Sequence, residues 1–142
     1  MSEVLDTVEG IATDAGFEPE RHQDSIVIKF ALPGDRVQSV FVAESGKSPG
    51  GMTVISFLSP CQRVKAGFLG GMSKGHALDL LRRNAALPFA AFSLLSTDKG
   101  EMVCVRGTQL LETMDLAEFA ASCECVATFA DRYEADQGRD DF

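Results

Sequence analysis

The sequence contains no apolar run that approaches the roughly 20 residues a membrane-spanning helix needs. Its opening residues, 1–10, are acidic and lack the basic and then apolar layout of a secretory signal peptide. These absences predict a cytoplasmic protein with no membrane partner. In the cytoplasm its four cysteines are expected to stay reduced; they are Cys61, Cys104, Cys123 and Cys125.

The sequence also lacks the ligand spacing of a metal site. Cys123 and Cys125 are two positions apart in a predicted helix, so they point to different faces and cannot bind one ion together. His22 and His76 have no partner at metal-ligand spacing. We therefore expect no metal and no other cofactor, and we expect most of the cysteines to act as small buried apolar side chains.

Catalytic motifs are missing as well. Gly46-Lys47-Ser48 is similar to the end of a phosphate-binding P-loop, but Phe41 occupies the position where that motif requires glycine. The acidic residues fall on predicted helix surfaces, where solvated carboxylates are expected, so no pair is singled out for acid–base chemistry. One candidate nucleophilic pair remains, Cys61 with His76. With this pair, a less favoured alternative function is that of an enzyme or small-ligand-binding protein that uses segment 60–76.

The charge is negative overall and unevenly spread along the chain. The net charge is −8. Residues 1–24 carry seven acids and one base, and residues 115–142 carry eight acids and two bases, so each end contributes −6. Residues 63–83 carry five bases and one acid, which gives +4. Most of such a surface would repel phosphate, which argues against a nucleic-acid partner.

Periodicity predicts three helices and five strands. Apolar residues at helical spacing predict helices over 2–15, 75–84 and 116–136, and Asp115 with Glu118 forms a capping box before the last one. Strands are predicted over 25–32, 37–44, 52–59, 89–95 and 101–107. Asp98-Lys99-Gly100 predicts the turn of a β-hairpin between the last two strands.

The predicted order is α-β-β-β-α-β-β-α, and its short connections favour an α+β domain with a mainly antiparallel five-stranded sheet packed with helices. We expect one domain over 1–136 and a frayed acidic tail over 137–142. The glycine-rich segment 60–74 is either a loop with its apolar side chains tucked inward or an exposed apolar patch. The last helix, about 31 Å long, is long enough to cover a five-stranded sheet about 19 Å wide.

This combination resembles the type III secretion chaperone-like superfamily, which contains the CesT-type effector chaperones and the YbjN-type proteins. The similarity rests on the helix end Leu80-Leu81-Arg82-Arg83-Asn84, the hairpin around Asp98-Lys99-Gly100, and the acid-capped helix from Asp115. It covers nearly the whole element order and agrees with the size and the acidic charge. The resemblance implies an α+β domain that forms homodimers.

The resemblance also implies two sets of contact residues. The partner-binding candidates come from the first helix and the first strand: Val4, Leu5, Val8, Ile11, Ile26, Ile28 and Phe30. The dimer-contact candidates come from the helix and strand around the later loop: Leu78, Leu81, Phe89 and Phe92. Every one of these residues is equally explained as part of the hydrophobic core.

The sequence therefore predicts a non-enzymatic, homodimeric binding protein that masks an apolar segment of a partner protein, such as a secreted effector, on an exposed sheet edge or groove. The alternative within the same superfamily is a YbjN-type stress or regulatory protein that has no export client.

Overall fold

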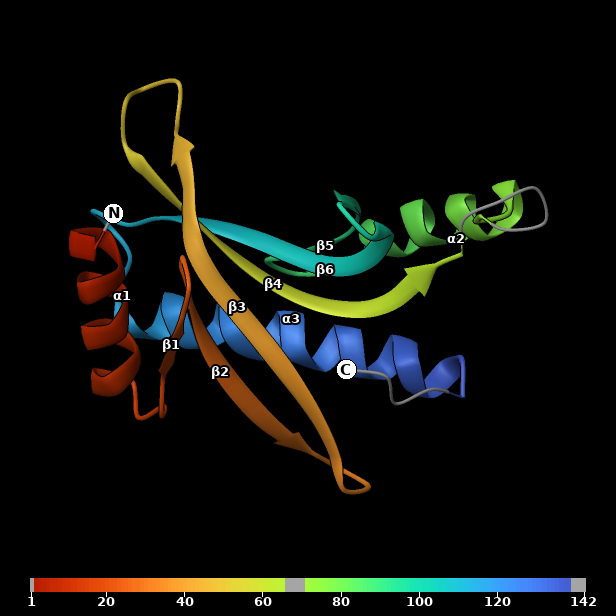
Figure 1. Cartoon of the computed structure of the whole chain (residues 1–142), viewed down its shortest axis with the longest axis horizontal. Helices are drawn as coiled ribbons and strands as arrows, with labels where there is room; N and C mark the ends of the chain where they lie inside the picture. Colours follow the sequence, from red (N-terminus) through yellow and green to blue (C-terminus); the bar gives the residue numbers. More distant parts are fainter. Residues whose placement is uncertain (1, 66–70, 139–142) are drawn as a thin grey trace.

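The computed structural model describes residues 2–65 and 71–138, and within these ranges it contains three helices and six strands (Figure 1). The chain runs through α1 (Ser2–Asp14), β1 (Glu20–His22), β2 (Ser25–Leu32), β3 (Arg36–Lys47), β4 (Thr53–Val64), α2 (Lys74–Asn84), β5 (Ala91–Thr97), β6 (Gly100–Leu110) and α3 (Leu116–Asp136). The predicted tail beyond Gly138 and positions 66–70 of the glycine-rich segment lie outside the described residues.

The α+β class and the antiparallel pairing are confirmed, but the predicted strand number is wrong. The strands form one sheet in the order β1-β2-β3-β4-β6-β5, and every neighbouring pair is antiparallel. The additional strand, β1, has only three residues, and all of them are exposed. It pairs with β2 through its backbone. A strand without an apolar face leaves no periodic signal in the sequence.

Strand β4 extends beyond its predicted end because a β-bulge accommodates a proline. The register against β6 shifts between Pro60 and Gln62, so the missing N–H of Pro60 does not interrupt a regular ladder. The carbonyl oxygen of Pro60 accepts a hydrogen bond of 2.7 Å from the side-chain amide of Gln38, which is fully buried. Val64 at the end of β4 packs against the core, and so does Met72, which follows positions 66–70. These two apolar residues of the glycine-rich segment therefore point inward.

The hairpin between β5 and β6 forms as predicted, with Asp98 and Lys99 as its two-residue turn. Its first strand, however, begins at Ala91 rather than at Phe89. The φ angle of Phe89 is +60°, which is outside the range of a β-strand. The chain therefore turns sharply at Phe89 before β5 begins.

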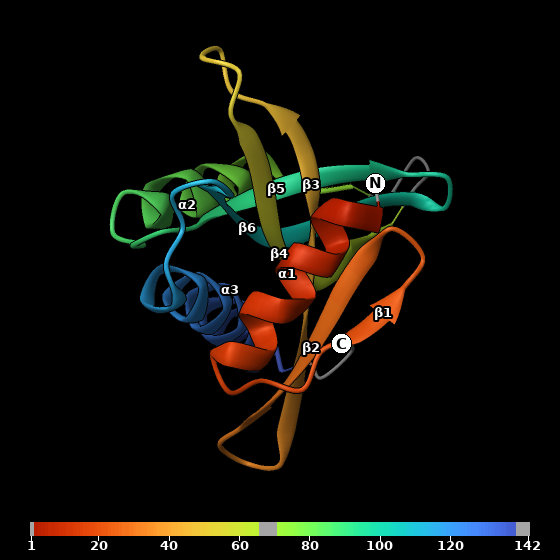
Figure 2. The same ribbon diagram turned by 90° about the vertical axis from the view of Figure 1, so that its left-hand side faces the viewer.

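Helices α1 and α3 cover one face of the sheet. Phe119 of α3 packs edge-on against Phe57 of β4, with ring centroids 5.4 Å apart, and both side chains are fully buried. Figure 1 shows α3 crossing behind β2, β3 and β4, and Figure 2 shows α1 beside it. Among the described residues no helix packs on the other face of these central strands, which we call the open face.

The core contains acidic groups that were expected to be solvated. Asp131 on α3 is buried and forms an ion pair of 2.6 Å with Arg36 of β3. Glu134, one turn further along α3, is fully buried. The helical pattern placed both positions among polar surface residues, so the burial of these two carboxylates corrects that expectation.

Candidate functional site

Exposed apolar side chains gather where α2 lies beside β5. Seven large apolar residues are exposed among the described residues, and five of them belong to α2, β5 or the loop between them. We call four of them the α2–β5 surface: Leu78 is 38% exposed, Leu81 65%, Phe89 59% and Leu94 51%, whereas Leu95, 37% exposed, points to the opposite face of β5. Single exposed apolar residues are common, whereas a cluster of this kind is typical of a surface that another molecule covers.

A groove runs along this surface between the helix and the strand. Its volume is about 220 Å³, and most of its lining is apolar. Leu81 and Leu94 of the α2–β5 surface line it, so part of the exposed cluster surrounds a concave site. The other lining residues are Met72, Ala77, Leu80, Asn84, Phe92, Ser93 and Val103.

Asn84 occupies part of the free backbone edge of β5. Its side-chain oxygen accepts a hydrogen bond of 2.7 Å from the N–H of Phe92, and its amide nitrogen donates one of 3.2 Å to the carbonyl oxygen of Phe92. The backbone groups of Phe92 therefore point away from β6. Because directions alternate along an antiparallel strand, the groups of Leu94 and Ser96 point outward too. Within residues 2–65 and 71–138, this leaves an open edge of two pairing positions.

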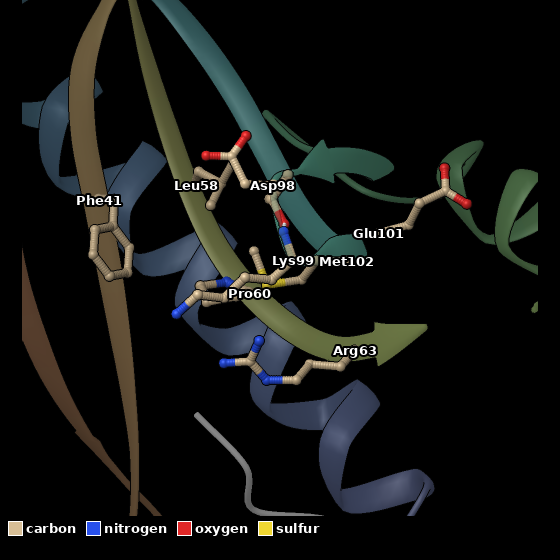
Figure 3. A pocket seen from close by; sticks show the side chains of 9 residues that line it. Phe41, Leu58, Pro60, Arg63, Asp98, Lys99, Glu101 and Met102 are labelled. Atoms are coloured by element: carbon tan, nitrogen blue, oxygen red, sulfur yellow. Dashed lines mark hydrogen bonds between the residues drawn. The ribbon is translucent and has the colours of Figure 1, made fainter. Parts of the chain in front are cut away.

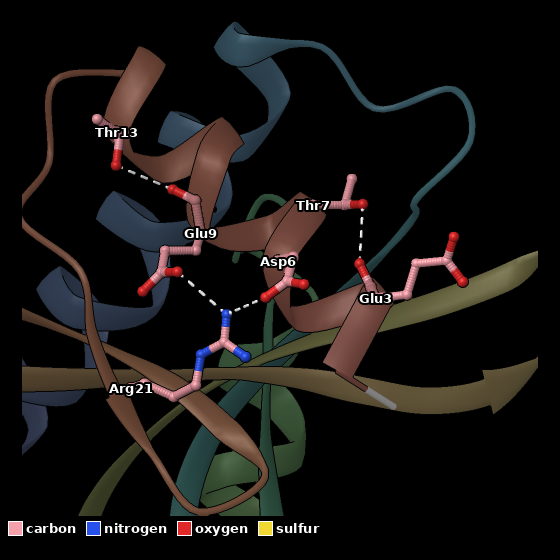
Figure 4. Close-up of polar contacts among 6 residues, drawn as sticks. All are labelled: Glu3, Asp6, Thr7, Glu9, Thr13 and Arg21. Atoms are coloured by element: carbon pink, nitrogen blue, oxygen red, sulfur yellow. Dashed lines mark hydrogen bonds and ion pairs between the residues drawn. The ribbon is translucent and has the colours of Figure 1, made fainter.

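The opposite edge of the sheet is protected. Strand β1 has three exposed residues, and Arg21 in its centre forms ion pairs with Asp6 at 2.7 Å and Glu9 at 3.0 Å on α1 (Figure 4). A short, charged edge strand is poorly suited to pairing with another chain. The longer β5 edge, with Leu94 and Leu95 exposed, has no comparable charged cover among the described residues.

Helix α2 is held in place by contacts on its other side. Ser73 caps its N-terminus by accepting a hydrogen bond from the N–H of His76. The ring of His76 lies 2.7 Å from the hydroxyl of Tyr133 on α3, and this hydroxyl also donates to Gln62. Leu80 is part of the core. These anchors give the groove a preformed helical wall.

Replacing Asn84 with Ala is expected to lower the free energy of unfolding by about 2 kcal/mol, because two hydrogen bonds to Phe92 are lost and its backbone groups are left open. Chemical denaturation measures the change. Asn84→Asp keeps the acceptor for the N–H of Phe92. Its free energy of unfolding should therefore lie between those of the original protein and Asn84→Ala. An unchanged stability of Asn84→Ala would show that the amide does not protect this edge.

The structure separates the two sets of contact candidates. Leu78, Leu81 and Phe89 from the dimer set are exposed on the α2–β5 surface. Phe92, the fourth, is half-buried, with its ring centroid 5.5 Å from that of Tyr133, and it lines the groove. The partner-binding set belongs to the core: Leu5, Val8, Ile26 and Ile28 are buried, and Val4, Ile11 and Phe30 pack partly buried against them.

The structure shows no nucleophilic arrangement of Cys61 with His76. The Cys61 thiol is fully buried and lies 3.4 Å from the carbonyl oxygen of Val103, to which it donates. Burial raises the pKa of this thiol far above its usual range, so it stays protonated. The ring of His76 contacts Tyr133 instead.

Thiol labelling of the native protein is expected to reach one cysteine of the four. Cys125 is half-buried, whereas the other three are buried, and burial raises the pKa of Cys104 to about 11. Cys125→Ser should therefore abolish slow native labelling at neutral pH, and Cys61→Ser should leave it unchanged. Peptide mapping of the labelled protein checks this. Native modification of Cys61 would instead support the enzymatic alternative.

Among the described residues, no group of three His, Cys, Asp or Glu side chains is placed to hold a metal ion. None of the three helices combines the length and apolarity that crossing a membrane requires. Comparison with models of known protein families found no match, and a search of curated proteins found none either.

Proposed function

We propose that this chain is a non-enzymatic binding protein that covers an apolar, extended segment of another polypeptide at the α2–β5 surface. The observation that carries the proposal is the coincidence of three features at one sheet edge: exposed leucines, a groove, and outward-facing backbone groups at Leu94 and Ser96 to which no second strand of the described residues is paired. Each feature alone is common, but together they match the requirements of strand addition to a sheet.

The binding mechanism follows from the alternation of a β-strand. A segment aligned with β5 would form backbone hydrogen bonds with Leu94 and Ser96, which lie beyond the position that Asn84 occupies. Alternate side chains of that segment would point toward the groove, where Leu81 and Leu94 are the most exposed lining residues. Backbone bonds would supply affinity, and the groove would select apolar side chains.

A second copy of the chain can occupy the same edge. Two β5 strands related by a two-fold axis would pair antiparallel. Leu94 and Ser96 of one copy would then form backbone hydrogen bonds with Leu94 and Ser96 of the other. In this arrangement the homodimer is the state without a partner, and a partner segment competes with the second copy. The dimer candidates Leu78, Leu81 and Phe89 would then be covered in both states.

The resemblance to type III secretion chaperones supports the same class of function, with a secreted effector as the partner. A YbjN-type regulator without an export client would use the surface for dimerisation alone. Recovery of one secreted protein with the native chain from its host would favour the chaperone, and recovery of the homodimer alone would favour the regulator.

The proposal is tested by size-exclusion chromatography with light scattering, using a synthetic peptide of residues 91–97 as the probe strand. We expect a dimer at micromolar concentration and its conversion to a peptide-bound monomer when the peptide is added. The control peptide is N-methylated at alternate residues, so it keeps its side chains but cannot complete the ladder. A protein that stays monomeric and binds neither peptide would contradict the proposal.

A further inference from the structure

The side chain of Asn84 pairs with β5 as a residue of a neighbouring strand would. In an antiparallel ladder, the two residues of a hydrogen-bonded pair exchange two bonds, each from an N–H to a carbonyl oxygen. Asn84 makes both of these bonds with Phe92, because its oxygen accepts at 2.7 Å and its amide nitrogen donates at 3.2 Å. The backbone of Phe92 is therefore already paired, and a strand added to β5 cannot use it.

The helix that carries Asn84 fixes its position. Asn84 is the last residue of α2, and Leu80, one turn earlier, belongs to the core. At the other end of the helix, His76 contacts Tyr133 of α3. Asn84 itself is half-buried, and moving its amide away from Phe92 would break two hydrogen bonds. An added strand therefore meets a fixed end of the free edge at Phe92.

Leu95 presents apolar surface at the same edge, but on the opposite face of β5 from the groove. It lies opposite Met102 in the ladder with β6, and residues opposite each other in a ladder share a face. Met102 lines a hollow on the open face together with Phe41 and Leu58 (Figure 3). Leu95 therefore lies on the open face, where it is 37% exposed and outside the α2–β5 surface.

Two copies of β5 can pair about a two-fold axis in different registers, which differ in the number of hydrogen-bonded residue pairs. The outward-facing backbone groups belong to Phe92, Leu94 and Ser96. With Leu94 on the axis, the ladder has three such pairs, but two of them need Phe92. With Leu95 on the axis, Leu94 of each copy pairs with Ser96 of the other, and neither pair needs Phe92. With Ser96 on the axis, one pair remains, because the next outward position is Asp98 in the turn.

We propose that Asn84 sets the register of a β5–β5 homodimer, with Leu95 of the two copies side by side on the two-fold axis. The inference rests on the proposed function, since it specifies how a second copy pairs at the same edge. Asn84 acts as a positioning residue, because it occupies Phe92. The Leu94-centred register then keeps one complete pair, whereas the Leu95-centred register keeps two. The Leu95-centred register also brings the two exposed Leu95 side chains into contact with each other.

Disulfide crosslinking at two positions measures the register. Leu95→Cys and Leu94→Cys are each combined with Cys125→Ser, which removes the half-buried native thiol. In the Leu95-centred register, the two Cα atoms at position 95 are about 4.5 Å apart, within the reach of a disulfide. Those at position 94 are about 9 Å apart, beyond that reach. Oxidised glutathione should therefore link the Leu95→Cys dimer at least about tenfold faster than the Leu94→Cys dimer. Equal linkage, or faster linkage of Leu94→Cys, would overturn the proposal.

Asn84→Ala tests whether Asn84 selects this register. The freed backbone of Phe92 adds two pairs to the Leu94-centred ladder, so the faster linkage should move from Leu95→Cys to Leu94→Cys. Asn84→Asp keeps the acceptor for the N–H of Phe92, and the faster linkage should therefore stay at Leu95→Cys. Circular dichroism confirms that each variant is folded. Lower stability of Asn84→Ala without an exchange of the two positions would show a merely structural role and overturn the proposal. If Asn84→Ala does not fold, the linkage rates with Asn84 intact still decide the register.

Sedimentation equilibrium of the same variants separates failure of this inference from failure of the proposed function. A dimer that is linked at neither position would overturn the register and leave the proposed binding surface standing. A monomer that binds the residue 91–97 peptide would overturn the homodimer and leave strand addition at β5 standing. A monomer that does not bind the peptide would overturn both.

Discussion

Gly107→Ala is expected to lower the free energy of unfolding by about 3 kcal/mol, because the site is already filled by backbone. A Cβ at Gly107 would overlap the carbonyl oxygen of Phe89 and lie 3.3 Å from its carbonyl carbon. Neither atom can move aside as a flexible side chain would, since the sharp turn at Phe89 joins α2 to β5. Chemical denaturation at fixed pH measures the loss.

Gly10→Ala is the matched control. Gly10 lies within α1, and a Cβ there would meet no atom within 4 Å. Alanine is preferred to glycine inside a helix, so this variant should be more stable than the original protein by about 0.5–1 kcal/mol. The same chemical change should therefore have opposite signs at the two positions. Similar free energies of unfolding for the two variants would show that the loop at Phe89 does not closely contact Gly107 of β6.

Leu81→Gln is expected to weaken dimerisation about thirtyfold, equivalent to about 2 kcal/mol, because the most exposed leucine of the α2–β5 surface would lie at the centre of the contact. Glutamine is a good helix former, so the stability of the monomer should change little. Sedimentation equilibrium measures the dissociation constant.

Leu116→Gln provides the control for this variant. Leu116 is 45% exposed and lies at the start of α3, outside the α2–β5 surface. The substitution removes the same exposed leucine chemistry from another helix, so dimerisation should not change. If Leu116→Gln and Leu81→Gln weakened the dimer equally, the effect would come from general surface hydrophobicity and not from the proposed contact.

The elements with strong apolar periodicity were predictable from the sequence. The bounds of β2 and α3 agree with the predicted ranges 25–32 and 116–136, and the capping box of Asp115 with Glu118 is present in the structure. In both elements, apolar side chains repeat at the spacing of one buried face. Local chemistry also specified the two-residue turn between β5 and β6.

The features that sequence analysis missed depend on backbone pairing or on partners distant in the chain. Strand β1 forms because its backbone pairs with β2. Its side chains are polar and give no periodic pattern from which that pairing could be predicted. The proline in β4 is accommodated by a bulge that only the β6 register reveals. Asp131 is buried because Arg36, 95 positions away, supplies the opposite charge.

The candidate site was predictable only in part. The resemblance singled out Leu78, Leu81 and Phe89, which the structure leaves exposed. Leu94 and Leu95 lie in the candidate strand from Phe89 but were not named individually, because an apolar run has the same pattern in a central strand as in an edge strand. The sheet order places β5 at the edge, and that order follows from long-range pairing.

Amide hydrogen exchange at Leu94 and Ser96 tests most directly whether another chain covers the β5 edge. Both amides point away from β6, so they should exchange quickly in dilute protein and at least about tenfold more slowly with the residue 91–97 peptide or in the dimer. The amides of Ser93 and Leu95 face β6 and should be protected in every state. Equally rapid exchange at Leu94 and Ser96 under all these conditions would contradict strand addition at this edge.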